Sequence, residues 1–115
     1  MMYVEFNAGN KEYKLKLNIG SIMALEKKIG VNPVAVFGLD ENKPEIPTIS
    51  TMVAILWASL QDAQHGISYA DAQDIFQAWI NDGNTPTDFI KVIMSVYRVS
   101  GIFKADSKAD GEEKN

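Results

Sequence analysis

The chain has 115 residues, of which 46% are hydrophobic and 23% are charged, and its formal net charge is −4. This length favours one hydrophobic core, and the composition is that of a globular domain, not of a disordered chain. Cysteine is absent, which excludes disulfides, thiolate metal sites and cysteine nucleophiles.

The basic residues are ten lysines and a single arginine, Arg98. The guanidinium group that binds phosphates and guanine in a bidentate manner is therefore almost missing, and we expect no nucleic-acid partner. The longest apolar run, residues 52–58, is much shorter than the roughly 20 residues that cross a bilayer, and residues 1–15 lack the pattern of a secretory signal. The sequence predicts a soluble protein without a membrane partner.

Residues 2–18 alternate between apolar and polar side chains, the period of a strand with one buried face. In the second half of this segment Lys14 and Lys16 occupy polar positions. Gly9 and Asn10, between the two halves, readily adopt positive φ and favour a tight turn. The segment is predicted to form a β-hairpin, whose apolar face must pack on the rest of the domain because an isolated hairpin is barely stable.

The pattern then becomes helical. Asn18 can cap a helix that Gly30 ends, with its apolar residues on one side. A short helical turn follows, with Pro33 at the first position, where the missing N–H costs nothing. Residues 38–47 combine proline, glycine and charge, and predict a surface loop.

Three longer helices are predicted after the loop. The first is apolar around most of its circumference, so we expect it to be the central helix. Trp57 and Trp79 fall on apolar helical faces, and we favour core packing over a role as interface anchors. Each helix begins at a side chain that can cap it and ends at or near a glycine: Thr48 to Gly66, Ser68 to Gly83 and Thr85 to Gly101.

Residues 104–115 contain no large apolar side chain and cannot bury enough surface to offset the entropy of ordering. We predict a disordered tail there. The predicted fold is therefore mainly α: an N-terminal β-hairpin packed on a bundle of about four helices, in one domain that spans residues 1–103.

Chemistry-bearing residues are few. The only histidine, His65, has Asp62, Asp71 and Asp74 nearby in the sequence, but one imidazole with carboxylates is not a zinc or di-metal ligand set. We favour a structural role for His65 at a helix C-terminus, where the helix dipole stabilises such a side chain. Without an assembled nucleophile and base, the sequence predicts no enzyme, no cofactor and no metal site.

Charge is distributed unevenly. Residues 1–30 carry five lysines and three acids, a net charge of +2, whereas residues 61–88 carry five aspartates and no lysine or arginine. We favour the interpretation that these faces are simply solvated. The alternative is that the polarity orients a partner.

Several segments together resemble the tail assembly chaperones of long-tailed phages and prophages of Gram-positive bacteria. They are "ALEKKIGVNPVAVF", "LQDAQHGIS" and "DFIKVIMSVYRVSGIF", within a resemblance that covers about residues 9–104. The resemblance implies a non-enzymatic factor that binds the tape-measure protein, recruits tail-tube subunits, acts in the host cytoplasm and is absent from the mature virion. It assigns no catalytic role to His65.

The predicted contact surfaces are the hairpin edge at Lys14 and Lys16 and the end of the last helix, from Tyr97 to Phe103. For the hairpin edge an equal alternative is that its lysines and short strands protect it from pairing. We expect weak self-association. Two other classes stay open: a structural head–tail connector or tail-completion protein, which would form a stable ring, and a small helical regulatory DNA-binding protein, which the acidic helices disfavour.

Overall fold

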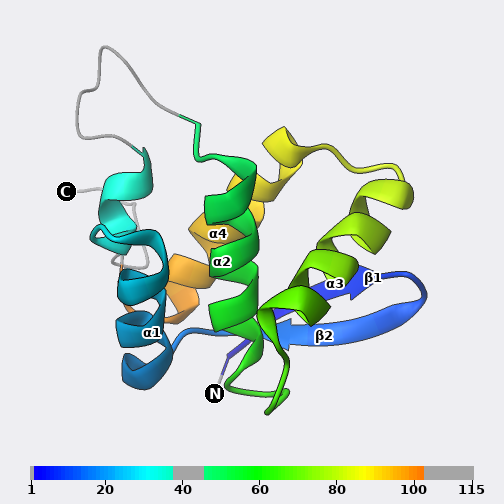
Figure 1. Ribbon diagram of the computed structural model, residues 1–115. Helices are drawn as coiled ribbons and strands as arrows, with labels where there is room; N and C mark the ends of the chain where they lie inside the picture. The colour runs from blue at the N-terminus through cyan, green and yellow to red at the C-terminus, as the bar shows by residue number, and fades with distance from the viewer. Residues whose placement is uncertain (1, 38–45, 103–115) are drawn as a thin grey trace, which may run out of the picture.

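A computed structural model of the chain describes residues 2–37 and 46–102. In this part of the chain an antiparallel β-hairpin packs on α-helices, which confirms the predicted fold class (Figure 1). The predicted tail, Phe103 and most of the predicted loop lie outside the described residues. The elements in chain order are β1 (Val4–Ala8), β2 (Lys11–Leu15), α1 (Ile19–Ile29), the 3-10 helix η1 (Pro33–Phe37), α2 (Ile49–Leu60), α3 (Tyr69–Asn81) and α4 (Pro86–Val99).

The helices begin where the sequence predicts capping side chains. At the start of α3 the Ser68 hydroxyl accepts the Asp71 N–H at 2.9 Å, and the Asp71 carboxylate accepts the Ser68 N–H at 3.0 Å. The same reciprocal arrangement joins Thr85 and Asp88 at the start of α4. In both pairs the backbone N–H lowers the pKa of the carboxyl group, and the hydroxyl of the capping residue lowers it further. These caps fix the helix starts locally.

Helix α2 is the central element. Figure 1 shows it between α1 and α3, with α4 behind, and eight of its twelve residues are buried. It ends at Leu60, earlier than the predicted end near Gly66. At this end the Gln61 N–H turns to Ala58 O, and two glutamine side chains bond to carbonyl groups of the last turn: Gln61 donates to Trp57 O at 3.0 Å, and Gln64 donates to Leu60 O at 2.8 Å.

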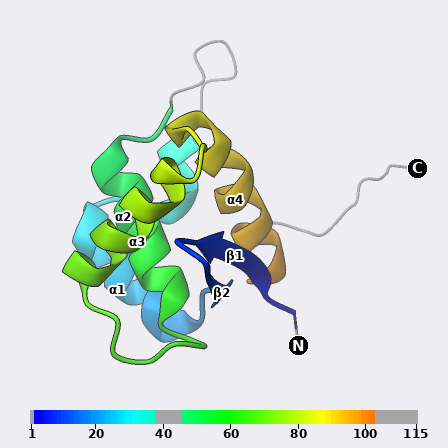
Figure 2. The same ribbon diagram turned by 90° about the vertical axis from the view of Figure 1, so that its right-hand side faces the viewer.

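Strand β1 packs on α3 and α4, whereas β2 packs on α2, and Figure 2 shows β1 between α3 and α4. The contact is aromatic. Phe6 of β1 lies 5.4 Å from Trp79 and 6.0 Å from Phe89, measured between ring centroids, and Phe76 lies 5.2 Å from Phe89. Trp79 is therefore a core residue, as predicted, whereas Trp57 is only partly buried.

Candidate partner-binding surfaces

The backbone of the hairpin has two outer edges, and its turn determines which groups point outward. Gly9 and Asn10 have φ of 58° and 67°, the conformation of a two-residue turn, and Ala8 lies opposite Lys11. Hydrogen-bonded and non-hydrogen-bonded pairs alternate from this pair onward. The N–H and C=O groups that point away from the partner strand are therefore those of residues 5 and 7 in β1 and residues 12 and 14 in β2.

The β2 edge is already paired over half its length. The Lys14 N–H donates to the Gln64 side-chain oxygen at 2.7 Å, and the Gln64 amide donates back to Lys14 O at 2.9 Å. One residue beyond the conventional end of β2, the Lys16 N–H donates to Ser59 O at 3.0 Å. The backbone at Lys14 and Lys16 is therefore not available to an added strand. Contact of the lysine side chains with a partner stays a prediction.

The β1 edge is different. In the described part of the chain, no group forms a hydrogen bond with the outward backbone atoms of Glu5 or Asn7, whose side chains are also exposed. Close to the start of this strand, a hollow of about 370 Å³ is lined by Met2 and by residues 95, 98 and 99 of α4. The free hairpin edge is thus on β1, next to the end of α4.

Tyr97 does not lie on a partner surface. The structure corrects that expectation, because the side chain is fully buried and its hydroxyl donates to Pro33 O at 2.9 Å. Burial raises the pKa of the Tyr97 phenol well above its ordinary value. Its role is to attach η1 to α4. Phe103, the other end of the predicted surface, lies beyond the residues that the structure describes.

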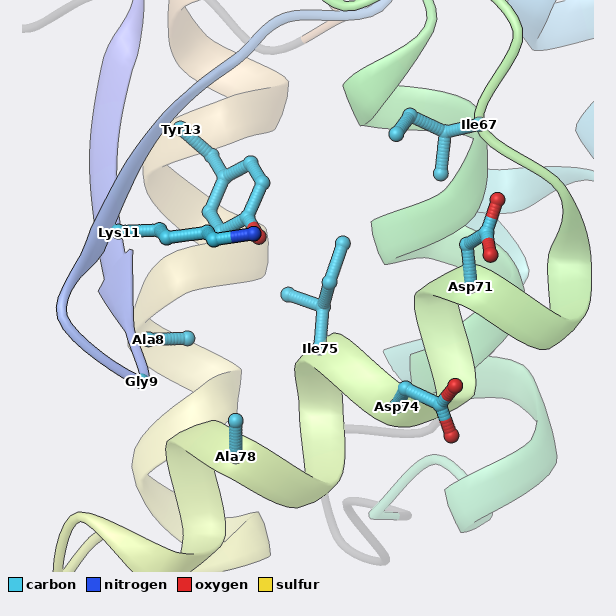
Figure 3. Close-up of a pocket in the computed structure, with 9 residues that line it drawn as sticks. All are labelled: Ala8, Gly9, Lys11, Tyr13, Ile67, Asp71, Asp74, Ile75 and Ala78. Carbon is cyan, nitrogen blue, oxygen red and sulfur yellow. The ribbon is translucent and has the colours of Figure 1, made fainter.

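A groove of about 380 Å³ lies between the hairpin and α3. Figure 3 shows Lys11 and Tyr13 extending from β2 toward α3, with Ile75 and Ala78 facing them from the helix. The floor is apolar, while the exposed side chains at the rim carry charge of opposite sign on the two sides. Its lining residues are Ala8, Gly9, Lys11, Tyr13, Ile67, Asp71, Asp74, Ile75 and Ala78.

The hairpin tip closes one end of this groove. The Gly9 N–H donates to the Asp82 carboxylate at 2.9 Å, which attaches the turn to the C-terminal end of α3. A Cβ atom at Gly9 would lie 3.2 Å from Cβ of Ala78, so a side chain at this turn would push the hairpin away from the helix. Glycine therefore serves both the positive φ and the close approach. The hairpin and α3, joined by the bond between Gly9 and Asp82, therefore form the two walls of the groove.

Asp62, in the turn after α2, connects this turn to the segments just before and just after the hairpin. Its carboxylate accepts hydrogen bonds from the Asn18 amide at 2.8 Å and from the Tyr3 hydroxyl at 3.0 Å. These two bonds, that of Asn18 first, lower the pKa of Asp62, and the charges of Lys16 and His65 lower it further. Among the described residues no three His, Cys, Asp or Glu side chains are grouped to hold a metal ion. His65 is exposed in the turn after α2.

The sequence matches, over residues 4–114, a family described as "Family of unknown function (DUF6096)". The chain belongs to DUF6096. The match includes every helix and strand of the structure and most of the predicted tail. No curated protein and no solved structure matches the chain. In the described part of this DUF6096 member, every helix is too short or too polar to cross a bilayer.

Sequence patterns alone did not identify the groove or the pairing of the β2 edge in this DUF6096 member. Gln64 is 50 residues away from Lys14, and its position in "LQDAQHGIS" gives no sign of a backbone contact with a strand. Lys11 and Asp74 face one groove only because the hairpin lies along α3. The period-two pattern did indicate which strand residues face inward, and that was the one available signal.

Proposed function

We propose that this protein is a non-enzymatic tail assembly chaperone, which binds the tape-measure protein of a long-tailed phage or prophage and recruits tail-tube subunits around it. The resemblance of its helical segments to that class supports the proposal. The structural observation that carries it is the groove between β2 and α3, because an apolar floor with charged rims suits binding by contact.

The groove fits an amphipathic helical segment of the tape-measure protein. Apolar side chains one turn apart on such a segment would cover Ile75 and Ala78, and polar neighbours would meet Lys11 on one rim and Asp74 on the other. Ile75 is only 9% exposed, so the floor offers a small apolar contact and not a deep cavity. One copy would bind weakly.

Weak binding by each copy is compatible with the proposed task. Many copies along one long partner add their affinities through a high effective concentration, without any single strong site. The net charge of −4, and the absence of lysine and arginine from residues 61–88, would keep such a coated complex soluble by mutual repulsion.

Gene order gives the first test. The proposal expects a very long, helix-rich reading frame directly downstream of this one. Co-expression of that protein with this chain should move it from the insoluble to the soluble fraction, and the two should elute together from a sizing column. A long partner that stays insoluble, or that elutes alone, would contradict the proposal.

The groove is tested by two variants on α3. Asp74→Lys reverses the charge at the rim, whereas Gln73→Lys adds a positive charge one residue away, at an exposed position outside the groove lining. We expect Asp74→Lys to reduce co-elution with the tape-measure protein and Gln73→Lys to leave it unchanged. Circular dichroism establishes that both variants fold. Equal effects of the two variants would remove the groove as the binding surface.

A further inference from the structure

We infer that two copies of this chain associate through strand β1, and that their hairpins join into one four-stranded antiparallel sheet. Such a dimer needs no tape-measure protein. The two edges of the hairpin differ: the β2 edge is paired at Lys14, and the β1 edge is open at Glu5 and Asn7.

An open strand edge binds another strand because its N–H and C=O groups keep their full capacity for hydrogen bonding. Single-domain proteins usually shield such edges with charge, bulges or proline. Residues 4–8 of β1 contain neither lysine nor proline, and all five pair in regular register with β2, so this strand has no bulge. Glu5 is the only charged residue on it.

The second copy fits this edge in one register better than in the others. A two-fold axis at Phe6 places Glu5 opposite Asn7 of the second copy, and Asn7 opposite Glu5 of the second copy. Both pairs are then hydrogen-bonded pairs, each exchanging two main-chain bonds. A carboxylate opposite a carboxamide involves no repulsion between like charges.

The neighbouring registers are less favourable. A shift of two residues in one direction places Glu5 opposite Glu5 of the second copy, which brings two carboxylates together. A shift of two residues in the other direction places Glu5 opposite Gly9 of the second copy. That pair requires the Gly9 N–H, which already donates to Asp82. A shift of one residue would turn the buried face of one hairpin outward. Charge and hydrogen bonding therefore select the axis at Phe6.

Met2 lies at the end of the proposed interface. With the axis at Phe6, Ala8 of the second copy lies opposite Val4, and the turn that follows Ala8 comes close to Met2, which is 69% exposed. Met2 also borders the hollow that residues 95, 98 and 99 of α4 line. An exposed methionine at this end of β1 gives the second copy an apolar contact in addition to the main-chain hydrogen bonds.

Substitutions of opposite charge at Asn7 test this register. In the dimer, each Asn7 lies opposite Glu5 of the other copy. Asn7→Lys therefore places a cation opposite Glu5 in both pairs, and Asn7→Glu places an anion there. With the full-length chain alone, sedimentation velocity over roughly 1 µM to 1 mM should show a monomer–dimer equilibrium. We expect Asn7→Lys to tighten it and Asn7→Glu to weaken it, each by roughly 2- to 30-fold, which corresponds to two cross-strand pairs.

Proline substitutions compare the two edges directly. Glu5→Pro removes an outward N–H from β1, and Glu12→Pro removes an outward N–H from β2, and neither group bonds within the hairpin. Glu5→Pro should abolish the dimer and Glu12→Pro should retain it, with thermal unfolding as the check on folding. A chain that stays monomeric throughout, or equal loss in both variants, overturns the inference. Neither result bears on tape-measure binding, which is measured separately.

Discussion

The two strands of the hairpin are equal in length but are held to the helical body in different ways. Strand β2 buries the side chain of Leu15 and is in addition attached through its main chain, because the Gln64 side chain pairs with both backbone groups of Lys14. Strand β1 is attached through its side chains, chiefly Phe6, which packs among the aromatic rings of α3 and α4. Strand β1 is thus anchored firmly by its side chains while its backbone edge is left available to another chain.

Replacing Phe6 should have the largest effect, because it removes the main attachment of β1. The side chain is 3% exposed and contacts the rings of Trp79 and Phe89. We expect Phe6→Ala to lower the free energy of unfolding by about 3–5 kcal/mol, measured by urea denaturation. Tyr13→Ala, at the cross-strand partner that is only partly buried, should cost clearly less. A loss below about 1 kcal/mol for Phe6→Ala would mean that its packing does not hold β1.

Replacing Gln64 should have an intermediate effect that is confined to β2. Gln64→Ala removes its two bonds to Lys14 and one to Leu60, and we expect a loss of roughly 1–2 kcal/mol, since exposed hydrogen bonds contribute little each. Amide hydrogen exchange should become faster at Lys14. At Lys16, whose N–H bonds to the backbone, it should change less.

Gln61→Ala is the matched control for this prediction. Gln61 donates to Trp57 O and Ile67 O, so its loss should destabilise the same turn without exposing the Lys14 amide. If exchange at Lys14 rises equally in both variants, the β2 edge depends on the turn as a whole and not on direct pairing with Gln64.

The elements that the sequence predicted correctly are those with local causes. Asn18 and Ser68 each bond to residues three positions away, so the chain near them suffices to locate a helix start. The features it did not predict join distant segments. The carbonyl group that the Tyr97 hydroxyl meets belongs to Pro33, 64 residues earlier, and only the folded chain brings the two together.

The sequence analysis placed Tyr97 on a contact surface at the end of the last helix, and the structure buries it instead. Tyr97 lies on the same side of α4 as the buried residues 89, 93 and 96. A helix buries the face that its apolar period marks, and for Tyr97 this period was the relevant signal. At the early end of α2, glutamine side chains beyond the helix bond to its last carbonyl groups, and the hydrophobic period does not record such bonds.

Acid should produce the smallest effect, and it should loosen both strands together. Asp62 accepts hydrogen bonds from Tyr3, just before β1, and from Asn18, just after β2, and these bonds lower its pKa from 3.8. A carboxyl group whose pKa is lower in the folded state contributes its full stabilisation at pH values above its ordinary pKa. For Asp62 this contribution is lost as the pH falls below 3.8 and through the lower pKa of the folded state.

The effect should be modest, since Asp62 is only partly buried and solvent screens such interactions. We therefore expect the free energy of unfolding to decline gradually below pH 3.8, and the decline to be shallower in Asp62→Asn. Asp74→Asn, at an exposed carboxylate without a hydrogen bond in the described chain, should keep the wild-type slope. Amide exchange at Val4 and at Leu15 should rise in parallel as the acid contribution is lost. If exchange rises at Val4 and not at Leu15, the bond from Tyr3 to Asp62 stabilises β1, and the bond from Asn18 to Asp62 does not stabilise β2.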